Sequence, residues 1–160
     1  MDRRAWLAAA ALLAMRPALA HHAEFRTLRP GDFNTLVAAR RGKAFLLVFW
    51  SLAGDVSQAD LGLLAELRAA HPAMPLVLVC VDGVALQGPA GKALIARGIE
   101  HESIWIFVNR NNATLRAEVD PAWDGGVPRS YLYGADGARE TLAGALDRAR
   151  IESWLATLGG

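Results

Sequence analysis

The chain has 160 residues, 53% of them hydrophobic, so it is long enough for one domain with a sizeable core and too apolar for a disordered segment. Its 17 basic and 16 acidic residues nearly cancel, which argues against a nucleic-acid-binding protein. A single cysteine, Cys80, excludes an internal disulfide.

The first twenty residues have the pattern of a secretory signal peptide. Arg3 and Arg4 precede an apolar run at residues 5–15, and Ala18-Leu19-Ala20 matches a small-residue cleavage site. The run is much shorter than the roughly 20 residues of a membrane span, and no later stretch reaches that length. We expect a signal peptide at residues 1–20 and one secreted or periplasmic domain at residues 21–160. Cleavage would remove three arginines and one aspartate, leaving a formal charge of −1.

From Phe25 onward the sequence alternates between strand and helix patterns. Short apolar runs predict strands at residues 25–28, 44–50, 76–81, 104–108, 129–133 and 138–142. Apolar residues at helical spacing predict helices at residues 32–41, 56–70, 89–97, 112–120 and 146–158. Asp32 and Asn112 are expected to cap the first and fourth helices, and Pro72 ends the second.

This order of elements predicts an α/β fold. Strands that alternate with helices need crossover connections, which place a sheet between layers of helices. The last two predicted strands flank Asp136-Gly137, a hairpin turn, so the sheet should be mixed. No repeat or linker divides the chain.

The joint between the strand at residues 44–50 and the following helix carries a resemblance. Phe49, Trp50 and Ser51 end the strand as in the thioredoxin superfamily, particularly its exported TlpA-like and ResA-like branch. That family continues with Trp-Cys-x-x-Cys, whereas the same register here reads Ala-Gly-Asp-Val-Ser at residues 53–57. The chain therefore resembles a thioredoxin-like protein with a degenerate active site.

A second match is Gly126-Val127-Pro128, which precedes the last pair of strands. In the thioredoxin superfamily this position holds a cis-proline loop that faces the active-site turn, so the resemblance implies a cis bond before Pro128. The similarity extends over about residues 25–158. It implies a three-layer sandwich in which a mixed central sheet of about five strands is flanked by helices.

The missing cysteines decide the expected chemistry. Disulfide exchange needs an attacking thiolate and a second thiol that resolves the mixed disulfide. Ser57 offers only a hydroxyl, Gly54 has no side chain, and Asp55 places negative charge where a thiolate would be. We therefore expect no dithiol activity. The resemblance implies a non-catalytic protein-binding or accessory module that serves envelope redox work or metalloprotein maturation.

The family's cis-proline loop pairs with the backbone of bound peptide, so the expected ligand is an extended polypeptide segment. The residues expected to line its cleft are Trp50, Gly54, Asp55, Ser57, Val127, Pro128 and Arg129. Helix capping is an alternative explanation for the polar residues of the turn. Asp55 with Gln58, and Ser57 with Asp60, both have the spacing of a capping box.

Two other functions remain open from the sequence. Cys80 could support a one-thiol activity if it were exposed with a lowered pKa, although its apolar strand favours a buried, inert thiol. His21 and His22 would form the new N-terminus, where imidazoles and a free amine can bind copper. No further ligand cluster accompanies this pair, and no motif indicates a cofactor.

Overall fold

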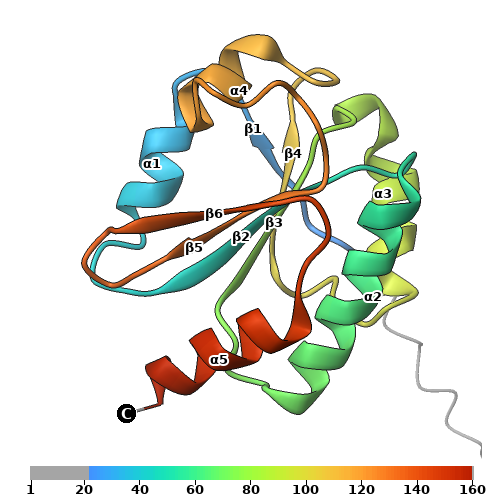
Figure 1. Ribbon diagram of the computed structural model, residues 1–160. Coiled ribbons are helices and arrows are strands. Elements are labelled where there is room, and N and C mark those ends of the chain that lie inside the picture. Colours follow the sequence, from blue (N-terminus) through green and yellow to red (C-terminus); the bar gives the residue numbers. More distant parts are fainter. Residues whose placement is uncertain (1–21, 160) are drawn as a thin grey trace, which may run out of the picture.

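The computed structural model describes residues 22–159, and in these residues a six-stranded sheet lies between two layers of helices (Figure 1). The predicted signal peptide and His21 lie outside the described residues. The strands are β1 (Arg26–Leu28), β2 (Phe45–Trp50), β3 (Leu76–Cys80), β4 (Ser103–Phe107), β5 (Arg129–Tyr133) and β6 (Arg139–Ala143). Their order is β1-β4-β3-β2-β5-β6, with β1 to β4 parallel and β5 and β6 antiparallel. The mixed sheet is confirmed, with six strands rather than about five.

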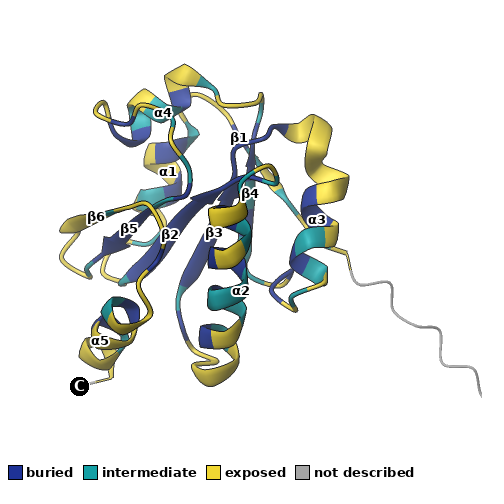
Figure 2. Cartoon of the chain, turned by 45° about the vertical axis from the view of Figure 1, so that its right-hand side comes forward, coloured by how far each residue is buried: buried dark blue, intermediate teal, exposed yellow. Residues whose placement is uncertain are grey.

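The five α-helices cover both faces of this sheet. One face is covered by α1 (Asp32–Ala38) and α4 (Ala113–Val119). The other is covered by α2 (Asp55–Ala70), α3 (Gln87–Ile95) and α5 (Arg148–Leu158). Figure 2 shows that the buried residues gather on the strands and on the inward sides of the helices. This confirms the three-layer sandwich expected from the alternating pattern.

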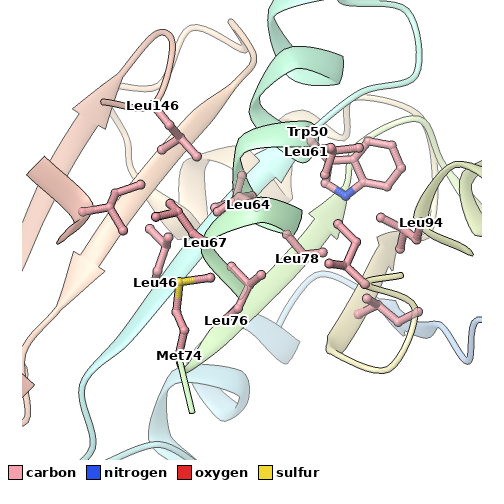
Figure 3. Close-up of a cluster of buried hydrophobic side chains, with 14 of the residues drawn as sticks. Leu46, Trp50, Leu61, Leu64, Leu67, Met74, Leu76, Leu78, Leu94 and Leu146 are labelled. Atoms are coloured by element: carbon pink, nitrogen blue, oxygen red, sulfur yellow. The ribbon is translucent and has the colours of Figure 1, made fainter. Parts of the chain in front are cut away.

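The centre of the sheet is β2, whose six residues are all buried. Because side chains alternate across a strand, Leu46, Val48 and Trp50 pack under α2, while Phe45, Leu47 and Phe49 face α1 and α4. Figure 3 shows the first of these clusters, in which leucines of β2, β3 and α2 point toward one another. Each fully buried side chain of this size contributes roughly 1.5–3 kcal/mol. This burial on both faces explains why the strand reads as one apolar run.

Several element ends differ from the sequence predictions. Asp32 was expected to cap α1, but Gly31 holds the N-cap position with φ of 94°, and the Asp32 carboxylate accepts a hydrogen bond from the N–H of Arg29 instead. A 3₁₀ turn, η1 (Val84–Leu86), precedes α3. The last helix begins at Arg148 because the side chain of Asp147 accepts from the N–H of Arg150 and caps it. The predicted cap at Asn112 is confirmed, since its side chain accepts from the N–H of Leu115 at 3.0 Å.

The outer edge of the sheet at β6 is open to solvent. Four of the five residues of this strand are exposed, and its Glu140 pairs with Arg150 of α5. Within residues 22–159, no helix is long and apolar enough to cross a membrane.

Candidate functional site

The turn after β2 and the loop before β5 lie at the same edge of the sheet. In the antiparallel pair, Phe49 is opposite Arg129, so one further step along this register places Pro128 beside Trp50. The peptide bond between Val127 and Pro128 is cis, as expected. The structure therefore brings together the two segments that the sequence singled out, residues 50–57 and 127–129.

The turn that joins β2 to α2 is held by Asp82, which lies two residues after the end of β3. Its Oδ1 accepts a hydrogen bond from the Ser51 hydroxyl at 2.7 Å, and its Oδ2 accepts from the N–H of Leu52 at 2.7 Å. Asp82 is only 6% exposed, so these bonds are shielded from water. The sequence analysis missed this residue. The sequence did offer a signal, namely an aspartate shortly after a predicted buried strand. Because the carboxyl ends of neighbouring parallel strands lie side by side, such an aspartate can reach the turn that follows the next strand.

Inside the turn, Ser57 has no exposed surface, and its Oγ accepts a hydrogen bond from the N–H of Ser51 at 3.3 Å. Gln58 donates from its side-chain amide to the carbonyl of Ser51 at 3.0 Å. Ser57 and Gln58 thus hold the turn through hydrogen bonds to the backbone of Ser51, while the side chain of Asp55 is exposed to solvent.

The capping-box explanation for the start of α2 is wrong. Gly54 holds the N-cap position, and no side chain caps the helix. Gln58 is turned toward Ser51, and Asp60 accepts a hydrogen bond from the N–H of Leu146 at 3.0 Å, 86 residues further along the chain. Both side chains form these hydrogen bonds instead of capping the helix, because the carbonyl of Ser51 and the N–H of Leu146 would otherwise lack a partner away from solvent.

The loop before β5 is braced from two sides. The Trp123 indole N–H donates to the carbonyl of Gly126 at 2.8 Å. Arg129 donates to the Asp120 carboxylate and to the Tyr131 hydroxyl, both at 2.6 Å, and its side chain is 16% exposed. The hydrogen bond from Arg129 holds the pKa of Asp120 below its usual value. Much of the Arg129 charge is therefore already paired within the protein.

The backbone of this loop remains available. Among the described residues, no hydrogen bond uses the N–H or the carbonyl of Val127, whose side chain is half-buried. Of the four large hydrophobic side chains that are exposed within residues 22–159, three follow the carboxyl ends of β2 and β3: Val56 is 46% exposed, Val84 41% and Leu86 39%. An open backbone segment therefore lies at the same sheet edge as a set of exposed apolar side chains.

Similarity to known proteins is found at the level of structure. No protein-family model matches the sequence, and no curated protein sequence matches it. A secreted disulfide oxidoreductase of Mycobacterium tuberculosis, homologous to Escherichia coli DsbE, superposes with a TM-score of 0.59 and 19% identity, covering 75% of this chain and 85% of its own. A thiol:disulfide interchange protein of the thioredoxin family from Chlorobium tepidum gives 0.59 and 16%, with 77% and 84% covered. StoA of Bacillus subtilis gives 0.53 and 18%, with 72% and 84% covered. The chain has the thioredoxin fold.

By the sequence resemblance, the positions that correspond to the two cysteines of the thioredoxin family are Gly54 and Ser57. A Cβ atom built on Gly54 would lie 3.7 Å from the Cβ of Ser57 and 3.5 Å from its Oγ. Disulfide-bonded cysteines have Cβ atoms about 3.5–4.5 Å apart. The backbone of the turn therefore keeps the spacing of a cysteine pair although neither cysteine is present.

The remaining thiol, Cys80, lies in β3 with no exposed surface. Burial raises its pKa to about 12, so it is protonated at neutral pH. The exposure and lowered pKa that a reactive thiol needs are both missing.

For the metal alternative, His22 is exposed and His21 lies outside the described residues. Within residues 22–159, no group of three or more histidine, cysteine, aspartate or glutamate side chains is placed to hold a metal ion.

Proposed function

We propose that this protein is an exported thioredoxin-fold domain that performs no dithiol exchange and binds an extended polypeptide segment at the edge formed by residues 52–56, 84–86 and 126–129. The observation that carries the proposal is the combination of a preserved turn with no thiol in it. The turn and the cis-proline loop are the parts that the resemblance assigns to peptide binding, and here they stand together without redox groups.

Two features support a polypeptide as the ligand. The unpaired N–H and carbonyl of Val127 can exchange hydrogen bonds with the backbone of an incoming strand. The exposed side chains of Val56, Val84 and Leu86 offer apolar contacts to alternate side chains of that strand. The role we assign is accessory, in envelope redox work or metalloprotein maturation, by analogy with the disulfide-exchange proteins that share the fold.

The binding proposal is tested by titrating ¹⁵N-labelled protein with a reduced, carboxymethylated polypeptide, which is unfolded and carries no free thiol. We expect NMR shift changes confined to the three segments named above. Val56→Lys should weaken binding, whereas Leu158→Lys serves as a matched control because Leu158 is also an exposed helical hydrophobe, at 39%, and lies in α5. Shift changes elsewhere, or equal loss in both variants, would contradict the proposed surface.

The redox part of the proposal is tested separately by insulin reduction with dithiothreitol. We expect the unmodified protein to give no rate above the reductant alone. The accessory role is tested by deleting the gene in its host and measuring haem-stained c-type cytochrome, where an unchanged level would oppose that role.

A further inference from the structure

A pocket of about 350 Å³ opens at the amino ends of the parallel strands, which is the end of the sheet opposite the candidate peptide site. It is bounded by the first residues of four strands and by the segment that connects α1 to β2. Its polar lining consists of Arg26 from β1, Arg40 and Lys43 from the connecting segment, and Ser103 from β4. The volume is in the range of small-ligand sites. The candidate peptide site lies at the carboxyl ends of β2 and β3, so the two sites are separate.

The pocket concentrates positive charge without counter-charge. None of its lining residues is acidic. Among the ion pairs of the described residues, none includes Arg26, Arg40 or Lys43. Burial, and then the nearby charge of Arg26, lower the pKa of Arg40. Three cationic residues therefore line one pocket with no acidic residue among its lining, so an anion bound there would be stabilised by their charge.

Ser103 provides a directed neutral donor at the same place. Its Oγ accepts hydrogen bonds from Nη2 of Arg40 at 2.7 Å and from the Trp105 indole N–H at 3.2 Å. Within residues 22–159, no hydrogen bond uses the proton of this hydroxyl. Because both acceptor positions are taken, the hydroxyl is set up to donate rather than accept.

Contacts within the protein leave the positive charge of the three cations unneutralised. Arg40 donates from Nη1 to the carbonyl of Leu36 at 2.7 Å, which satisfies the last turn of α1. The Arg26 guanidinium lies 5.5 Å from the centre of the Trp105 ring, a cation-π contact that does not neutralise its charge. Among the described residues, no ion pair includes the side chain of Lys43.

We propose that this pocket binds a small oxyanion, namely a phosphate or sulfate group. Arg40 and Ser103 donate from within the pocket, and Arg26 and Lys43 supply charge at its mouth. A free anion and the head group of an anionic lipid present the same tetrahedral oxygens, and the second arm of the test below distinguishes these two sources.

The test uses purified protein and inorganic phosphate, titrated by calorimetry and ¹⁵N NMR at constant ionic strength with chloride as the balancing anion. We expect saturable binding with shift changes at residues 40–45 and 103–105. The exposed pair Arg26→Gln/Lys43→Gln should weaken binding at least about tenfold, because even one of the two lost charge-assisted contacts corresponds to about that factor. Lys92→Gln/Arg110→Gln removes the same charge at exposed positions outside the pocket and should leave binding unchanged.

A second arm identifies the source of the oxyanion by co-sedimentation with phosphatidylglycerol vesicles and, as control, phosphatidylcholine vesicles. Saturable phosphate binding without vesicle binding supports a soluble anion, and vesicle binding lost in the Arg26/Lys43 double variant supports a lipid head group. Equal weakening in both double variants, or no binding in either arm, overturns the proposal.

Discussion

Introducing two cysteines at the start of α2 should create a working disulfide. In Gly54→Cys/Ser57→Cys, the 3.7 Å between the Cβ positions matches disulfide geometry without movement of the backbone. Gly54 has φ of −108° and ψ of 122°, an ordinary extended conformation, so a side chain there causes no backbone strain. We therefore expect the pair to oxidise in the folded protein.

The size of the effect follows from the loop that the disulfide closes. A closed loop of four residues restricts the unfolded chain by about 2 kcal/mol. For a domain of this size that corresponds to a rise in melting temperature of roughly 5–10 °C. Ser57→Cys also loses the hydrogen bond accepted from the N–H of Ser51, worth about 1 kcal/mol, but this loss is common to both redox states. Comparing the oxidised and reduced forms of the same variant isolates the disulfide.

The assay combines thermal unfolding with thiol counting under denaturing conditions. The oxidised variant should show one free thiol, from Cys80, and the reduced variant three. Insulin reduction should appear in the double variant and be absent from each single variant. If the folded double variant kept three free thiols under oxidising conditions, the geometry assigned to the turn would be refuted.

Three further predictions concern buried polar groups. Asp82→Ala should lower the free energy of unfolding by about 2–3 kcal/mol in urea titrations, because it leaves the buried hydroxyl of Ser51 and the partly buried N–H of Leu52 without their acceptor. The variant should also speed amide exchange at Leu52, and unchanged exchange there would contradict the anchoring role. Cys80 should resist thiol reagents until the protein unfolds. Because burial raises its pKa to about 12, the contribution of the protonated thiol to stability is present below pH 9 and is lost as the pH rises toward 12. The difference in the free energy of unfolding between the natural protein and Cys80→Ala should therefore shrink between pH 9 and pH 12. Asp60 has a pKa raised by burial, and its Oδ2 has no hydrogen-bond partner, so its favourable contribution is present at low pH and lost as pH rises. Asp60→Asn, which keeps the acceptor for Leu146, should therefore be more stable than the natural protein at pH 7 by about 1 kcal/mol and not at pH 3.5, and an equal difference at both values would contradict this reasoning.

The sequence predicted those parts of the fold that depend on local pattern. The apolar run of β2, the proline stop after α2 and the cap at Asn112 are set by neighbours in the chain, and each was correct. The cis bond before Pro128 followed from resemblance and was also correct. Asp32 was misassigned because a glycine one residue earlier adopts the left-handed conformation and begins the helix itself.

The candidate site was less predictable because its polar partners are distant in sequence. Asp82 reaches back about thirty residues to the turn, and Asp60 reaches Leu146 across most of the domain. A local reading assigns Asp60 to a helix cap because that partner is near in the sequence. Only the folded sheet, which brings strand ends together, shows that Asp82 and Asp60 connect separate segments.

The open edge of the sheet at β6 also bears on how the protein avoids unwanted association. A long, apolar edge strand invites pairing with another chain and subsequent aggregation. This edge instead carries the charged residues Arg139 and Glu140, and Glu140 forms an ion pair with Arg150 of α5. The opposite edge strand, β1, has only three residues. Both edge strands thus disfavour the addition of a strand from another chain. Backbone pairing at Val127 therefore does not compete with non-specific association at the sheet edges.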